Sequence, residues 1–265
     1  FLLGVFGVQL AGGAVCPLEK AIKDDRILEI MDFVDSNIYL ADKAVKNENV
    51  NNISLKELFK AVQDEENPIE PIDFEFPKAD ELSEILFTTG TTGKSKGIEV
   101  TYGCDIFIAQ NVMDSVEMGK DEVELITTPI NHSLAIRRTY GAIYNGSSVV
   151  LTDGIKFVED FFKLLDNYKI TAITFVPAIL EQVLKFAKDR FATYDNQFHY
   201  IQLGSAPLSE TNKEILTKMF PTTRLYNTYG ATESGCTVIL EFSKYGDKQK
   251  CIGRTTVNTE ILFVD

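Results

Sequence analysis

Short apolar runs alternate with amphipathic segments from residue 84 onward, and this alternation restricts the possible folds more than any other feature of the chain. The expected strands are 84–88, 98–101, 123–127, 148–151, 170–176, 200–203 and 224–227. The expected helices are 104–118, 134–144, 157–168, 178–188 and 209–220. Such a pattern predicts a layered α/β fold with largely parallel sheets and helices on both faces.

The regions on either side of this pattern suggest three subdomains. Residues 1–80 form a first, incomplete α/β subdomain, and 81–236 form the central one. Residues 237–265 carry strand and turn signals without a helix, which indicates the start of a β-rich subdomain. Within the first subdomain we expect a buried helix, a buried strand ending at Pro17, a strand at 37–41 and an acidic, proline-rich linker at 64–80.

Charge and cysteine usage exclude several classes of partner. The formal net charge is −13, and so acidic a surface repels nucleic acid and anionic lipid. The apolar first 18 residues lack the basic start of a signal peptide and are interrupted by four glycines, so we expect no membrane insertion. The four cysteines form no CxxC pair, which argues against a zinc site and indicates a cytoplasmic protein.

A loop rich in threonine, glycine and lysine, Thr88 to Gly97, directly follows an apolar strand. Glycines let backbone N–H groups face an anion, threonine hydroxyls add donors, and lysines supply charge, so a polyphosphate is the expected ligand. A Walker A loop is disfavoured, because only two residues separate Gly90 from Gly93-Lys94-Ser95 where that motif needs four. A solvated surface turn is the remaining alternative.

A second loop, Leu225 to Ser234, offers an aromatic ring, a hydroxyl and a carboxylate after another strand. Tyr229 can stack on a purine, Thr232 can meet a phosphate oxygen, and Glu233 can hold Mg²⁺. The alternative is a buried tyrosine on a turn with an exposed glutamate. Ligands of open parallel sheets bind beyond the carboxyl ends of the strands, where we expect the loops 88–97, 204–207 and 228–235.

These segments resemble the motifs of the adenylate-forming superfamily, which includes acyl-CoA synthetases, peptide-synthetase adenylation domains and beetle luciferases. Phe87-Thr-Thr-Gly-Thr-Thr-Gly-Lys-Ser-Lys-Gly97 is similar to the phosphate-loop signature Thr-Ser-Gly-Thr/Ser-Thr-Gly-x-Pro-Lys-Gly, with Thr89 in place of Ser and Ser95 in place of Pro. Tyr226-Asn-Thr-Tyr-Gly-Ala-Thr-Glu233 is similar to the motif Asn-x-Tyr-Gly-x-Thr-Glu. Weaker similarities at 10–18 and 252–265 extend the resemblance over nearly the whole chain.

The resemblance implies a role for each matching residue. Nucleotide would be bound by three groups of residues: Thr88, Thr89, Gly90, Thr91, Thr92, Gly93 and Lys96 in the first loop; Gly204, Ser205, Ala206 and Pro207 beneath the adenine; and Asn227, Thr228, Tyr229, Gly230 and Thr232 in the second loop. Tyr229 would flank the adenine and Thr232 would contact the α-phosphate. Lys96, Thr232, Glu233 and His132 would be catalytic, and Glu233 would ligate Mg²⁺.

The segment Pro129-Ile-Asn-His-Ser133 bears on the substrate. It resembles the Pro-Leu-x-His stretch of acyl- and aryl-CoA synthetases, whose histidine stands at the acyl pocket. Peptide-synthetase adenylation domains have an aspartate here that holds an amino group, so the resemblance favours a carboxylic acid without an α-amino group. Arg137 and Arg138 follow; one of them could meet an acidic substrate, but a solvated pair is the expected interpretation.

The implied reaction uses ATP, Mg²⁺ and coenzyme A: a small carboxylic acid becomes an acyl-adenylate and then a thioester. The central subdomain 81–236 would bind the nucleotide and the acyl group. The superfamily's ribose-binding aspartate, hinge and small C-terminal catalytic domain lie beyond Asp265, so we expect this chain alone to bind nucleotide weakly and to be inactive. An acyl-AMP ligase that loads a carrier protein and a catalytically silent nucleotide-binding module are the alternatives.

Overall fold

A computed structural model describes residues 1–264 except 65, 67–72, 74, 90–94 and 246–249. Its centre is a seven-stranded sheet in the order β11-β10-β9-β8-β7-β5-β6. The strands are β5 (Val123–Ile126), β6 (Ser148–Leu151), β7 (Ala172–Phe175), β8 (Tyr200–Leu203), β9 (Arg224–Ala231), β10 (Gly235–Glu241) and β11 (Arg254–Thr255). Strands β5 to β9 pair in parallel, whereas β10 and β11 pair antiparallel, which confirms a largely parallel α/β fold.

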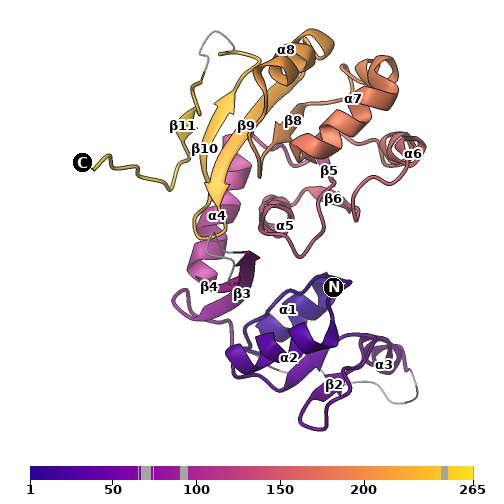
Figure 1. The fold of residues 1–265 in the computed structure, drawn as a ribbon, viewed down its shortest axis with the longest axis vertical. Coiled ribbons are helices and arrows are strands. Elements are labelled where there is room, and N and C mark those ends of the chain that lie inside the picture. The colour runs from indigo at the N-terminus through magenta and orange to yellow at the C-terminus, as the bar shows by residue number, and fades with distance from the viewer. Residues whose placement is uncertain (65, 67–72, 74, 90–94, 246–249, 265) are drawn as a thin grey trace.

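Helices cover both faces of this sheet, as predicted (Figure 1). Helices α6 (Val158–Tyr168), α7 (Pro177–Ala192) and α8 (Glu210–Met219) contribute to a core that includes Ile201 and Leu203. Helices α4 (Tyr102–Ser115) and α5 (Ser133–Asn145) contribute to a second core that includes Tyr200. Since alternate side chains of a strand point to opposite faces, β8 places Tyr200 and Gln202 toward α4 and α5.

The strands expected at 84–88 and 98–101 do not join the main sheet. They form the antiparallel pair β3 (Leu82–Thr89) and β4 (Ser95–Thr101), a separate two-stranded sheet. The expectation that the loop between them follows a strand of the main parallel sheet is therefore wrong. Helix α4 begins directly after β4 and contacts β3, β4 and β10, so it connects the hairpin to the main sheet.

The N-terminal part contains α1 (Leu2–Leu10), α2 (Asp24–Phe33), β1 (Ile38–Leu40), β2 (Asn51–Ile53) and α3 (Leu55–Val62). Strands β1 and β2 pair in parallel. Helix α1 buries only Val5 and Gln9, and the strand expected before Pro17 is reduced to a single bridge between Val15 and Glu84. The expectation of a buried helix and a full buried strand is therefore wrong.

The C-terminal segment continues the main sheet. Strand β10 pairs with β9 from Gly235 to Glu241, so the expected boundary between 236 and 237 falls inside a strand. Where a β-rich subdomain begins stays a prediction. Over the described ranges, none of the helices has the length and apolar character needed to cross a lipid bilayer.

Candidate functional site

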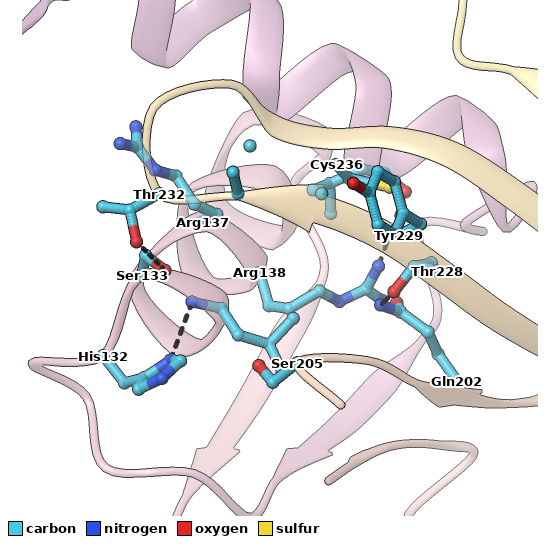
Figure 2. Close-up of a pocket in the computed structure, with 15 residues that line it drawn as sticks. His132, Ser133, Arg137, Arg138, Gln202, Ser205, Thr228, Tyr229, Thr232 and Cys236 are labelled. Atoms are coloured by element: carbon cyan, nitrogen blue, oxygen red, sulfur yellow. Dashed lines mark hydrogen bonds between the residues drawn. The ribbon is translucent and has the colours of Figure 1, made fainter. Parts of the chain in front are cut away.

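A cavity of about 240 Å³ lies beyond the carboxyl ends of β8 and β9, on the side of the sheet covered by α4 and α5 (Figure 2). Its wall draws on α5, on both sides of the β9–β10 turn and on the residues at the end of β8; the predicted site residues in it are His132, Ser205, Thr228, Tyr229, Gly230 and Thr232. The cavity lies at the edge where ligands of parallel sheets bind. Three motifs that are far apart in sequence therefore converge on one site.

His132 stands at the mouth of the cavity as the N-cap of α5. Its Nδ1 accepts a hydrogen bond from the Leu134 N–H at 3.3 Å. The ring remains partly exposed, yet burial of its inner side lowers its pKa, so the neutral form predominates at neutral pH. Because Nδ1 accepts, the ring proton sits on Nε2 and makes that nitrogen a donor.

Backbone packing shapes the end of β9. A Cβ on Gly230 would lie 1.9 Å from the Gly235 carbonyl oxygen, so only glycine fits where the two strands of the turn meet. A Cβ on Gly204 would lie 2.6 Å from Thr228 Oγ1. That hydroxyl donates to the Leu203 carbonyl at 3.1 Å. Glycine at 204 lets the end of β8 approach β9 closely, and glycine at 230 lets β9 approach β10.

Two further predicted residues have distinct surroundings. Ser205 has a φ of 68°, in the left-handed region, at the turn that leaves β8. The side chain of Tyr229 is 61% exposed, so one face of its ring is available to a planar ligand. The predicted residues Ala206 and Pro207 are exposed beside Ser205, and Asn227 lies on β9 outside the cavity wall.

Thr232 and Glu233 occupy the β9–β10 turn. The hydroxyls of Thr232 and Ser133 lie 3.5 Å apart, which joins this turn to the start of α5. Glu233 is exposed and is absent from the cavity wall. The described residues contain no group of three His, Cys, Asp or Glu side chains that could hold a metal by themselves. A cation at Glu233 would therefore need ligands from phosphate or water.

The hairpin supplies the remaining predicted residues. Thr88 on β3 is paired with Lys96 on β4, and Lys96 is exposed. Thr89 closes β3. Gly90, Thr91, Thr92 and Gly93 lie outside the described residues. The helix that follows the hairpin, α4, contributes Val112 to the cavity wall.

Arg137 and Arg138 are buried, so the prediction that they form a solvated pair is wrong. Their exposed fractions are 3% and 1%, and both contribute to the cavity wall. Arg137 pairs with Asp105 on α4 and lies 3.0 Å from Glu84 on β3. In Figure 2 its guanidinium points away from Arg138 and Gln202.

Arg138 forms a second buried network. Its Nε and Nη2 donate to the two carboxylate oxygens of Glu124 at 2.8 and 2.6 Å, and Nη2 also donates to the Tyr200 hydroxyl at 2.9 Å. Burial by itself would lower the pKa of Arg138, but Glu124 more than offsets this and the pKa is raised. Arg138 is therefore a fixed cation whose charge is balanced beneath the cavity.

Glu84 is fully buried, and burial raises the pKa of its carboxyl to about 7 although Arg137 acts in the opposite direction. Asp105 increases the effect because it places a second carboxylate beside the same arginine. The Tyr140 hydroxyl donates to Glu84 at 3.2 Å. One arginine thus faces two carboxyls, and near neutral pH Glu84 is partly protonated.

The profile of the AMP-binding enzyme family matches residues 1–265. D-alanine–D-alanyl carrier protein ligase from Bacillus thuringiensis (strain Al Hakam) is 25% identical over 241 residues, which cover 88% of this chain and 47% of that protein. The corresponding ligase from Staphylococcus haemolyticus (strain JCSC1435) is 25% identical over 237 residues, with the same shares covered. The chain spans about half the length of these curated relatives.

Solved structures share the fold. An o-succinylbenzoate CoA synthetase (MenE) of Bacillus subtilis, bound to a product analogue, aligns with a TM-score of 0.82 at 22% identity over 96% of this chain and 51% of that one. The same enzyme in complex with ATP and magnesium ion aligns with a TM-score of 0.80 at 21% identity over 96% of this chain and 52% of that one. With a profile match over its full length and this fold, the chain belongs to the AMP-binding enzyme family of adenylate-forming ligases.

Proposed function

We propose that the protein containing this chain activates a small carboxylic acid without an α-amino group and transfers it to coenzyme A. A carboxylate oxygen of the acid attacks the α-phosphorus of ATP, which forms an acyl-adenylate and releases pyrophosphate. The sulfur of coenzyme A then attacks the acyl carbon, which forms a thioester and releases AMP. The chain would supply the sites for ATP and for the acid.

The composition of the cavity wall carries this proposal. The wall contains His132, Arg137 and Arg138 but no aspartate or glutamate among the described residues. A substrate ammonium group needs a carboxylate partner once it leaves water, because an unpaired buried charge is costly. The wall supplies none, whereas the carboxylate of an acid can accept hydrogen bonds from His132, Ser133 or Thr232.

Several side chains would act in the first step, the formation of the acyl-adenylate. The His132 Nε2–H can donate to the acid's carboxylate or to the adenylate carbonyl, and the start of α5 offers a positive helix end beside it. Thr232, in the turn beside Ser133, would donate to a phosphate oxygen, and the exposed ring of Tyr229 would stack on adenine. Lys96 would neutralise phosphate charge. Glu233 would ligate Mg²⁺, which when bound offsets the charge of the phosphates.

The acceptor is tested with the full-length protein. Pyrophosphate release is measured across a panel of carboxylic acids, and thioester formation is then measured with and without coenzyme A. We expect acid-dependent pyrophosphate release and coenzyme A-dependent loss of the adenylate. Strong activity with amino acids alone would contradict the proposal.

We also propose a cytoplasmic location. The four cysteines are unpaired, which supports a cytoplasmic setting.

A carrier-protein acceptor is the second candidate, and the names of the curated relatives favour it. In that case the full-length protein would form the adenylate but would leave it intact in the presence of coenzyme A. Transfer to the phosphopantetheine thiol of a carrier protein would then replace thioester formation with coenzyme A.

A catalytically silent nucleotide-binding module is the third candidate. Glu233→Ala separates it from a ligase, since a ligase loses adenylation whereas a module keeps its nucleotide affinity and has no activity to lose. Glu210→Ala on α8, also an exposed glutamate, is the matched control. We also expect this chain alone to bind ATP–Mg²⁺ weakly, and robust pyrophosphate exchange by it would contradict that expectation.

A further inference from the structure

Gln202 on β8 has one end of its side-chain amide without a hydrogen-bond partner. The residue is 2% exposed and is part of the cavity wall (Figure 2). Its Nε2 donates to Thr228 Oγ1 at 3.1 Å, while Oε1 is buried and unpaired. The observation does not depend on which way the amide is turned, because only one of its two ends reaches Thr228.

A buried amide end without a hydrogen-bond partner costs stability, because burial removes the group from water. The last side-chain torsion of glutamine has a broad energy profile, so a small tilt of the amide can turn this end toward the cavity, whereas a large rotation would break the hydrogen bond from Nε2 to Thr228. The cavity beside it is where a partner can enter. A ligand that carries a hydroxyl or carbonyl group would restore the missing hydrogen bond.

The charges around Gln202 decide which polar group fits. In the view of Figure 2 the guanidinium of Arg138 extends toward Thr228 and Gln202, but its Nε and Nη2 already hold both oxygens of Glu124. Arg137 is shared by Glu84 and Asp105. Neither arginine has spare positive charge for a second substrate carboxylate. Beside Gln202 a neutral polar group of the ligand is therefore favoured over a second carboxylate.

The volume of the cavity limits the size of the ligand's carbon skeleton. Its volume of about 240 Å³ is below the ~300–1,000 Å³ of most small-molecule pockets, so a long hydrocarbon chain does not fit inside it. Apolar contacts come from Val112 on α4 and Leu134 on α5. A short or single-ring carbon skeleton fits between them.

We propose that Gln202 determines specificity, and that the acid is a short-chain or single-ring monocarboxylic acid with a neutral hydroxyl or carbonyl substituent hydrogen-bonded to the Gln202 amide. This inference rests on the proposed function and deepens it. The polar substituent supplies the partner that the amide lacks, while an unsubstituted acid leaves the amide unpaired.

The experiment compares matched acids with the full-length protein. The pairs are benzoate against each hydroxybenzoate and butanoate against hydroxybutanoate, with succinate as the dicarboxylate, and kcat/KM is measured from pyrophosphate release. We expect a hydroxylated member to exceed its parent by about ten- to a hundred-fold, the range expected when one buried polar group loses or gains its only partner. Preference for the unsubstituted acids, or for succinate, overturns the proposal.

Gln202→Leu separates the contribution of the amide to acid selectivity from that of the cavity's shape. We expect the ratio of kcat/KM between hydroxylated and parent acid to fall to near one in this variant. Gln197→Leu is the matched control, because the Gln197 amide donates to the Leu165 and Ile170 carbonyls outside the cavity. A ratio that persists in Gln202→Leu, with thermal unfolding and ATP affinity like those of the parent protein, overturns the proposal.

The result also separates this inference from the proposed function. If no acid of a broad panel gives pyrophosphate release, the proposed function fails and the inference fails with it. If acids are activated without regard to the substituent, the ligase assignment stands and the role of Gln202 alone is refuted.

Discussion

Ser133 and Thr232 are 99 positions apart in the sequence, yet their hydroxyl oxygens lie 3.5 Å from each other. Ser133 opens α5 directly after His132, and Thr232 lies in the β9–β10 turn just before Glu233. The contact places the residue expected at the acid beside the residue expected at the α-phosphate. In an adenylation reaction those two groups must meet.

Thr232→Val should lower adenylation in the full-length protein by about a hundred- to a thousand-fold, the range expected when one donor to a developing charge is lost. The isosteric valine keeps the volume but removes the hydroxyl, so folding should change little. Thr232→Ser, which restores the hydroxyl, is the matched variant and should keep most activity. Equal pyrophosphate exchange rates for Val and Ser would remove Thr232 from the mechanism.

Glu84→Gln should make stability less dependent on pH. The pKa of Glu84 is raised from 4.5 to about 7 in the folded state, so the folded protein binds more protons than the unfolded chain between these values. Stability from the protonated carboxyl is therefore fully present below pH 4.5 and is lost as the pH rises through 7. Glutamine resembles the protonated form at every pH.

Urea unfolding at a series of pH values measures this effect. Relative to the parent protein, Glu84→Gln should gain on the order of 1–3 kcal/mol between pH 5 and 8. Glu99→Gln on the neighbouring strand β4, where the side chain is exposed, is the control and should give a flat difference. A Glu84→Gln difference that is flat or falls with pH contradicts the raised pKa.

Arg138→Met should destabilise the protein by about 3–5 kcal/mol, because it leaves the fully buried Glu124 without its cation. Adding Glu124→Gln should recover part of this loss, since the second change removes the unpaired charge. Denaturant midpoints of the two single variants and the double variant give the coupling. If the double variant were as unstable as the sum of the single ones, the two side chains would not be energetically coupled.

Gly230→Ala should disrupt the β9–β10 turn. The added methyl group would meet the backbone of Gly235, which cannot turn aside as a flexible side chain can, and overpacking of this kind costs about 1–3 kcal/mol. Adenylation should fall more steeply than stability, because Thr232 and Glu233 share the turn. Gly7→Ala on α1 is the control: its Cβ meets nothing within 4 Å, so it should be neutral or slightly stabilising. Equal effects of the two substitutions would contradict the crowding at Gly230.

Much of the fold follows from local pattern. The strand expected at 200–203 is β8, and the strand expected at 148–151 is β6. The helix expected at 209–220 with Ser209 as N-cap is α8, whose cap accepts from the Asn212 N–H. These elements have clear periodicity and clear end signals, and both are local properties of the sequence.

Which strands pair with each other was harder to predict. Alternating strands and helices suggested one sheet, but β3 and β4 are adjacent in sequence and pair with each other through a short connection. A connection too short for a crossover favours an antiparallel hairpin. That signal was present in the spacing of 84–88 and 98–101 and was outweighed by the general pattern.

The buried arginines were missed for a different reason. A charged pair on a helix gives no indication of its orientation, and exposed arginines are far more common than buried ones. The informative signal lay elsewhere, in Glu84 and Glu124, which interrupt otherwise apolar strands. A carboxylate inside a buried strand requires a cation nearby, and these two match Arg137 and Arg138.

The approach of Arg137 to Glu84 makes α5 and β3 mutually dependent. Replacing α5 with a helix that has no arginine at position 137 would leave the carboxyls of Glu84 and Asp105 without their cation. Any exchange of α5 therefore has to include Glu84 and Asp105 together with the helix. Through this contact the cavity wall and β3, the strand before the loop predicted to bind phosphate, form one structural unit.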